Sequence, residues 1–195
     1  MFGWLAARSS SLCRHAPLTV VSRRSRRIHP LALWRKLPAL GSVLYLHVAS
    51  GEPPVQALPR GLLVGHRAFA PLLDTRWLVA TSAVTDDGPR EWFECMDAFG
   101  RTQARLHLLP DTDYFAWEAL MAPCEPERRT PVSAGVIRFR PDSASVTAFR
   151  LRELAGIAVL ESGRPARLSP LGDRIAARIA HAESAVLTNQ GPCPH

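Results

Sequence analysis

The sequence has 195 residues, of which 47% are hydrophobic and 21% are charged, so the chain can bury a substantial core and is not disordered as a whole. Its formal net charge is +7, a value that in many proteins indicates nucleic acid or an anionic membrane as partner. The charge is concentrated at one end: residues 1–51 hold eight basic side chains and no acid, whereas from Glu52 onward 16 arginines face 17 acids. The body is therefore close to neutral, and we expect no nucleic-acid partner.

The basic N-terminal segment is rich in arginine and serine and has only short apolar pieces, a composition typical of a targeting peptide or of an over-extended reading frame. We expect residues 1–36 to be a disordered basic leader or to precede the true start. The doublets Arg23-Arg24 and Arg26-Arg27 resemble a twin-arginine export signal, but prolines and charges interrupt the apolar stretch that such a signal needs. Residues 37–195 are expected to form a single domain.

The cysteines and the hydropathy pattern favour a cytoplasmic location. The four cysteines lie far apart, without a C-x-x-C pair, so neither a zinc site nor a dense disulfide framework is indicated. Since no apolar run reaches the roughly 18 residues that span a bilayer, we expect no membrane-spanning helix.

The first part of the body is predicted to be extended. Residues 42–50 are rich in β-branched and aromatic side chains and predict a strand. Two shorter extended pieces are expected at 55–58 and 61–64. A further strand is predicted over 76–85, ended by a turn at 86–89.

The clearest local pattern is a β-hairpin over residues 90–109, with a turn at Asp97–Gly100 in which glycine supplies a left-handed backbone. Side chains alternate between the two faces of a strand, so the second strand should have one packed face and one face toward water or a ligand. The packed set is Thr102, Ala104, Leu106 and Leu108. The other set is Arg101, Gln103, Arg105 and His107.

A helix should follow the hairpin over 112–121, with Asp111 as its N-cap. A proline-bounded, charged stretch then predicts a hinge near 122–131. Three further strands are expected at 132–140, 145–154 and 156–162, and an amphipathic helix at 171–187. The predicted fold class is α+β: a mainly antiparallel sheet with a β-hairpin followed by a helix, and a C-terminal amphipathic helix.

Catalytic motifs are not visible in the sequence. It has no Walker loop, dinucleotide-binding glycine pattern, H-E-x-x-H motif or nucleophile elbow. The paired acids Glu91 with Glu94 and Asp111 with Asp113 stand at predicted hairpin and helix starts, where solvated or capping roles are the common ones. The pattern therefore favours a non-catalytic protein.

The histidines lack the spacing of a multi-histidine metal centre, but a single axial ligand to haem needs only one imidazole. His66 stands next to Arg67, and His107 shares its predicted face with Arg105. An imidazole beside a guanidinium can bind iron and pair a propionate. We therefore take His66 and His107 as candidate metal ligands, and Arg67 and Arg105 as candidate partners of the haem carboxylates.

Two stretches, 37–61 and 90–121, resemble one repeat of the haemin-degrading and haemin-transport (HemS/ChuX-like) family. The resemblance lies in a strand and turn, a hairpin, and a helix containing A-W-x-x-L. The matching residues are Phe93, Asp97, Ala98, Gly100, Leu108, Ala116, Trp117 and Leu120.

The chain departs from that family at its ligands. No D-V-H-x-F-F helix occurs in residues 1–40, and Pro54–Ala57 stands where the family has an early histidine. No family ligand is thus carried over, and His66 and His107 remain candidates on their own chemistry. Full-length members have two repeats and this chain resembles one, which implies a homodimer that restores the second.

Three functions follow from these observations. The first is a cytoplasmic bacterial protein of iron utilisation that binds or transports haemin, with an apolar slot around Trp92 and Leu106 that takes the porphyrin. The second is an accessory interaction protein on the same scaffold that has lost its ligand; it predicts a filled slot and an apolar outer patch. The third is a haem-degrading enzyme.

Overall fold

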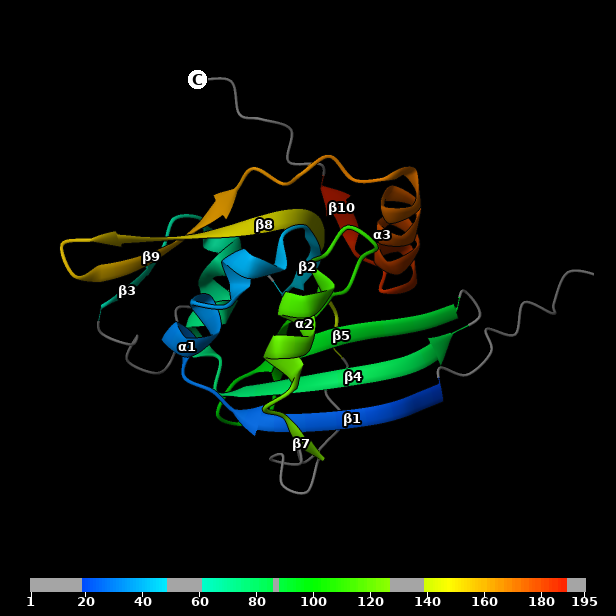
Figure 1. Cartoon of the computed structure of the whole chain (residues 1–195), viewed down its shortest axis with the longest axis horizontal. Helices are drawn as coiled ribbons and strands as arrows, with labels where there is room; N and C mark the ends of the chain where they lie inside the picture. Colours follow the sequence, from blue (N-terminus) through cyan, green and yellow to red (C-terminus); the bar gives the residue numbers. More distant parts are fainter. Residues whose placement is uncertain (1–18, 49–60, 86–87, 127–138, 189–195) are drawn as a thin grey trace, which may run out of the picture.

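The computed structural model describes residues 19–48, 61–85, 88–126 and 139–188. These residues form a ten-stranded sheet with the strand order β3-β9-β8-β2-β6-β5-β4-β1-β7, in which β10 also pairs with β8 (Figure 1). The strands are β1 (Thr19–Arg27), β2 (Val43–His47), β3 (Leu62–Val64), β4 (Trp77–Thr85), β5 (Gly88–Met96), β6 (Thr102–His107), β7 (Glu125–Pro126), β8 (Ser143–Leu154), β9 (Ile157–Gly163) and β10 (Val186–Thr188).

The helices are short and pack on both faces of this sheet. They are α1 (Pro30–Trp34), α2 (Tyr114–Met121), α3 (Pro170–Ala182) and the 3-10 helices η1 (Leu37–Leu40) and η2 (Arg67–Asp74). One face, which we name the core face, carries Leu106 and Phe93 and packs against side chains of α1, η1, η2 and α2. The opposite face, the α3 face, carries Leu44 and Leu46 and packs against α3.

The predicted hairpin is confirmed as β5 and β6, which pair from Trp92↔His107 to Met96↔Thr102. Gly100 has a φ of 77°, the left-handed conformation expected at the turn. The turn is held by Asp97, whose Oδ1 accepts hydrogen bonds from the backbone N–H of Phe99 at 2.8 Å and of Arg101 at 2.9 Å. The predicted alternation holds for Leu106, which lies in the core, and for Arg105 and His107, which lie on the α3 face. That face does not meet water as predicted, because His107 is only 4% exposed, and a bulge interrupts the pairing between Ala104 and Thr102.

The expected fold class is wrong in its extent and composition. The described residues form one large mixed sheet rather than a mainly antiparallel sheet built on one hairpin. Antiparallel pairs predominate, but β3 joins β9 and β10 joins β8 in parallel. β3 and β10 have three residues each, which is too few for the alternation of apolar and polar side chains to predict where they join the sheet.

Two predicted boundaries also differ from the structure. The sequence predicts that residues 19–36 belong to a disordered leader, but Thr19–Arg27 pairs with β4 along its length and Pro30–Trp34 is helical. The C-terminal helix ends at Ala182, and Val186 begins β10 rather than continuing the helical stripe. The extended piece at 55–58, most of the strand at 132–140 and much of the hinge at 122–131 lie outside the described residues.

The predicted absence of a membrane-spanning helix agrees with the structure. None of the helices in the described part of the chain is long and apolar enough to cross a bilayer.

Candidate functional site

The four residues nominated from the sequence do not form one site. His66 is the N-cap of η2, a helix that packs on the core face through Phe69 and Leu72. His107 lies on the α3 face of β6, beside Trp92 at 5.7 Å between ring centroids. The sheet therefore separates the two imidazoles. Arg67 is exposed next to His66, and Arg105 lies near His107.

The hydrogen bond of His66 opposes iron binding. Its Nδ1 accepts the backbone N–H of Ala68 at 3.2 Å, so Nδ1 carries a lone pair and the neutral ring has its proton on Nε2. An Nε2 that keeps its proton has no lone pair to give to a metal. Ligation through Nε2 would require His66 to give up the cap of η2.

His107 has the opposite properties: it is chemically suited to a metal but enclosed. Burial, and then the guanidiniums of Arg105 and Arg90, lower the pKa of His107 to about 3, so the ring is neutral. The residue is only 4% exposed, and neither ring nitrogen has a hydrogen-bond partner among the described residues. Such a group is uncommon, because buried polar atoms are nearly always paired.

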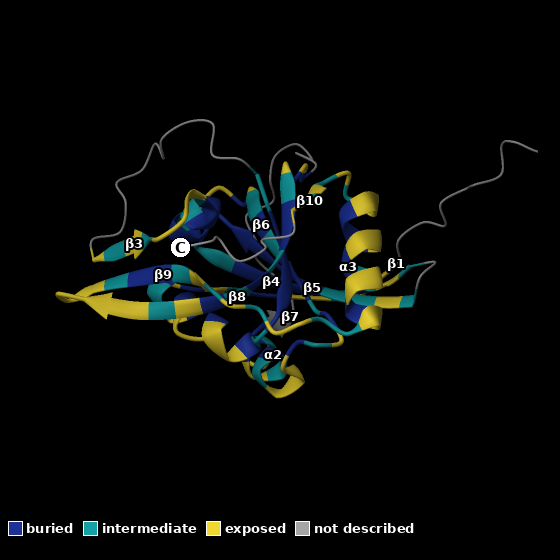
Figure 2. Cartoon of the chain, turned by 90° about the horizontal axis from the view of Figure 1, so that it is seen from above, coloured by how far each residue is buried: buried dark blue, intermediate teal, exposed yellow. Residues whose placement is uncertain are grey.

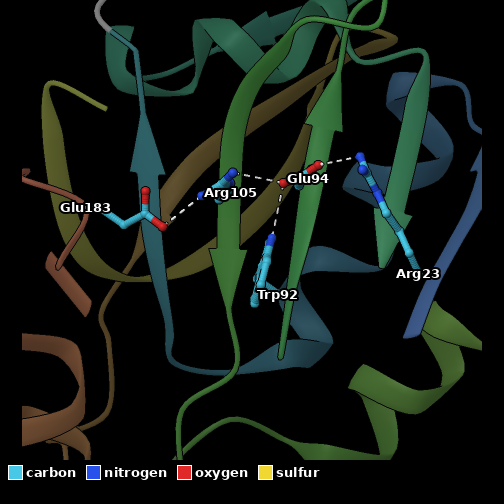
Figure 3. Close-up of polar contacts among 5 residues, drawn as sticks. All are labelled: Arg23, Trp92, Glu94, Arg105 and Glu183. Carbon is cyan, nitrogen blue, oxygen red and sulfur yellow. Dashed lines mark hydrogen bonds and ion pairs between the residues drawn. The ribbon is translucent and has the colours of Figure 1, made fainter. Parts of the chain in front are cut away.

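Arg105 is engaged in a network of charges around buried Glu94 (Figure 3). Its guanidinium contacts Glu94 Oε1 at 3.0 Å and Glu183 Oε1 at 2.8 Å. Glu94 also accepts from Arg23 at 3.1 Å and from the indole N–H of Trp92 at 3.2 Å. Two arginines thus balance two glutamates.

The network engages both terminal nitrogens of Arg105 and both carboxylate oxygens of Glu94, whereas Nε of Arg105 has no partner among the described residues. The guanidinium of Arg105 lies 5.8 Å from the ring centroid of Trp92 and 4.6 Å from that of Phe139, so aromatic rings cover it as well. A haem propionate would have to displace Glu94 or Glu183 from it. Both carboxylate oxygens of Glu94 accept hydrogen bonds, which removes this acid as a general base.

The apolar slot expected around Trp92 and Leu106 is filled. The two side chains lie on opposite faces of the sheet, because Trp92 pairs with His107 and Leu106 with Phe93. Leu106 is 0% exposed and Trp92 is 6% exposed. As a set, the nominated residues do not surround one open slot.

One cluster that the sequence analysis missed combines a serine, a histidine and an acid. Ser143 Oγ lies 3.4 Å from Nδ1 and 3.3 Å from Nε2 of His47. A hydroxyl at nearly equal distances from both nitrogens lies near the plane midway between them and so off the direction of either nitrogen's lone pair, so this contact does not activate a nucleophile. Burial lowers the pKa of His47 and Asp142 opposes that shift, but the three groups do not form a catalytic triad.

The described cysteines and acids add no reactive centre. Burial raises the pKa of Cys95 to about 12, and it also raises that of Cys124, so both thiols are protonated and weakly nucleophilic. Within the described ranges, no group of three His, Cys, Asp or Glu side chains is placed to hold a metal ion.

A cleft of about 300 Å³ lies away from all of these residues, between α1 and the β8–β9 hairpin. Leu31, Arg35, Leu151 and Glu153 are among its lining residues, and no aromatic side chain is. Its volume is at the lower end of the range for small-molecule pockets.

Comparison with known proteins adds no relative. No protein-family model matches the chain. No curated protein matches it either. The resemblance to the haemin-transport family therefore stays a prediction.

Proposed function

We propose that this chain is a non-catalytic accessory protein that binds a partner protein through its β8–β9 hairpin. The observation that carries the proposal is a group of large apolar side chains that the hairpin and its neighbour β3 expose. Leu154 is 62% exposed, Ile157 41% and Leu63 53%. Apolar side chains gathered on one surface mark interaction sites in soluble proteins.

The body of the molecule supports the same function. The two properties that distinguish a scaffold without a ligand are a filled slot and an apolar outer patch, and both are present. Large side chains fill the region around Leu106, and Arg105 is held by Glu94 and Glu183. The cleft beside the hairpin has no aromatic lining of the kind that a porphyrin would stack on.

A second candidate function is haem binding, and one observation favours it. His107 presents a neutral imidazole whose two nitrogens are unpaired among the described residues, which is the chemical state that an axial ligand needs. Binding would require the residues around Trp92 to open.

A haemin titration separates the two functions. We expect the purified chain to give no saturable change in the Soret band, and the double variant His66→Ala, His107→Ala to behave like the wild type. A saturable Soret shift that His107→Ala abolishes would replace the accessory function by haem binding.

The partner surface is tested by a photoreactive amino acid placed at Ile157 in the producing cell. We expect a discrete cross-linked species that disappears when Leu154→Lys is added. The matched control has the same photoreactive group at Leu171, which is 54% exposed on α3, and should give no such species. Equal cross-linking from both positions would contradict a specific surface on the hairpin.

A further inference from the structure

Three of the exposed apolar residues lie near one another on the β8–β9 hairpin and β3, and we name them the hairpin strip: Leu63, Leu154 and Ile157. Other exposed apolar residues, among them Val21, Phe115 and Val186, lie on other elements. Leu154 and Ile157 are directly paired across the hairpin, and Leu63 is paired with Val159, two residues along from Ile157. Paired residues share a face, and so do residues two apart in a strand. All three side chains therefore lie on the α3 face of the sheet.

The hairpin strip lies beyond the part of that face that α3 covers. Figure 1 shows the β8–β9 hairpin projecting from the body on the opposite side of the view from α3. Figure 2 shows its outer end as exposed. The first half of β8 is packed under α3 through Ala144, but its second half continues into the projection.

The strip also adjoins an open strand edge. β3 is the terminal strand of the sheet order, so one side of its backbone has no neighbouring strand among the described residues. An edge of unpaired N–H and C=O groups beside exposed leucines favours pairing with another chain.

The charges beside the strip have both signs. Arg152 and Glu161 lie on the same face as the strip and form an exposed ion pair at 3.4 Å. A partner with a large excess of one charge would meet one of these groups with the same sign. A two-fold axis, in contrast, can bring Arg152 of one copy against the partner's Glu161, and the reverse at the symmetric position.

We infer that the partner is a second copy of this chain, docked through the hairpin strip about a two-fold axis. The inference rests on the proposed function and specifies its partner. The apolar strip supplies the buried contact, and the Arg152 and Glu161 pairs of the two copies fix the register.

The first experiment measures the mass of the full chain in solution by light scattering or sedimentation. We expect a dimer for the wild type and a monomer for Ile157→Glu. The matched control is Leu171→Glu, an exposed leucine changed in the same way outside the strip, which should stay dimeric. A monomeric wild type at the highest attainable concentration, or a dimer that Ile157→Glu does not weaken, overturns the inference.

The second experiment exchanges charges between the copies. Arg152→Glu and Glu161→Arg should each weaken self-association, because each places like charges against one another across the axis. Mixing the two single variants should restore a dimer, since the carboxylate introduced at position 152 of one copy then faces the guanidinium introduced at position 161 of the other. Damage to the fold of either variant would not be repaired by mixing, so failure of the mixture to associate contradicts the proposed register.

The experiments distinguish failure of the hairpin as an interaction surface from failure of the second copy as its partner. If the species cross-linked from Ile157 has the mass of two chains, the hairpin is an interaction surface and the second copy is its partner. If it contains a different protein and the wild type is monomeric, the hairpin is still an interaction surface but the second copy is not its partner. A saturable haemin site with no cross-link at Ile157 contradicts both the interaction surface and the second copy as its partner.

Discussion

The guanidinium of Arg105 contacts the carboxylate of Glu183 at 2.8 Å and so ties β6 to the C-terminal end of α3, across 78 positions of sequence. Glu183 is the C-cap of α3, where the helix dipole disfavours a negative charge. Arg105 offsets that unfavourable charge while it also pairs with buried Glu94. One side chain thus joins both the sheet and the helix that covers it.

Replacing Arg105 by methionine should therefore destabilise the fold by about 3 kcal/mol, since Glu94 loses a buried partner and Glu183 is left unpaired at a helix end. Arg105→Lys should recover only part of this loss, because an ammonium cannot bridge two carboxylates as a guanidinium does. The free energy of unfolding in urea measures both effects. Arg164→Met, which changes an exposed arginine outside this network, is the control and should change stability by less than about 1 kcal/mol.

The buried neutral ring of His107 predicts a loss of stability in mild acid. Its pKa is about 3 in the fold and about 6.5 in an unfolded chain, so between these values the unfolded state binds more protons. Stability from this group is complete above about pH 6.5 and falls as the pH decreases toward 3. From roughly pH 7.5 to 5 the loss is about 2 kcal/mol.

Urea unfolding at several pH values, with His107→Leu beside the wild type, measures this contribution. The variant should lose the part of the pH dependence that belongs to His107. A smaller slope should remain in it, because burial lowers the pKa of His47 in the same direction. His66→Ala changes an exposed imidazole and is the control. Identical slopes in His107→Leu and the wild type would show that the ring is not held neutral by burial.

The turn of the β8–β9 hairpin contains a strained residue. Ala155 has a φ of 49° and Gly156 a φ of 80°, as two-residue hairpin turns with consecutive left-handed positions require. Asparagine adopts this conformation more easily than alanine, so Ala155→Asn should raise the free energy of unfolding by about 0.5–1 kcal/mol. Thermal unfolding measures the gain. Gly156→Ala should have the opposite sign, and a loss of stability in both variants would contradict the turn.

Local patterns predicted the hairpin and the alternation of β6, because period-two alternation and a turn glycine are properties of neighbouring residues. Leu106 and Arg105 were correctly assigned to opposite faces for this reason. The partners of Arg105 were not predicted, since Glu183 lies 78 positions away at the end of a helix and no local rule connects them. The sequence therefore suggested a haem carboxylate as the partner of Arg105, whose guanidinium pairs in the fold with Glu94 and Glu183.

The misassigned leader has the same cause. The arginine doublets of β1 indicate an unfolded basic tail when each charge is considered alone. In the fold, Arg23 reaches Glu94 at 3.1 Å, and the strand that carries it pairs with β4. A strand with four arginines has no apolar alternation to reveal it, and its pairing with β4 and the contact of Arg23 with Glu94 depend on residues far away in the sequence. The candidate haem ligands were misplaced for the same reason. The sheet lies between His66 and His107, and only the topology of the strands determines on which face each imidazole lies.

Asp111 shows how a correct residue type was assigned to the wrong helix. The N-cap of α2 is Asp113, whose Oδ1 accepts the N–H of Ala116 at 2.8 Å. Asp111 instead accepts the backbone N–H of Ser169 at 2.8 Å and its hydroxyl at 3.0 Å, and so supports the start of α3, 58 positions away. Ser169 in turn caps α3 by accepting the N–H of Gly172 at 3.1 Å.

This arrangement predicts a reversal of sign at Gly172. In an ordinary helix, glycine to alanine stabilises by about 1 kcal/mol. Here a methyl group at position 172 would overlap the Asp111 carboxylate, so Gly172→Ala must displace Asp111 from Ser169 and should destabilise the protein. In the background of Asp111→Ala, which removes the overlap, the same change should become stabilising. The free energies of unfolding of the wild type, the two single variants and the double variant form the cycle that measures this coupling. A change at Gly172 with the same sign in both backgrounds would mean that Asp111 does not hold the start of α3.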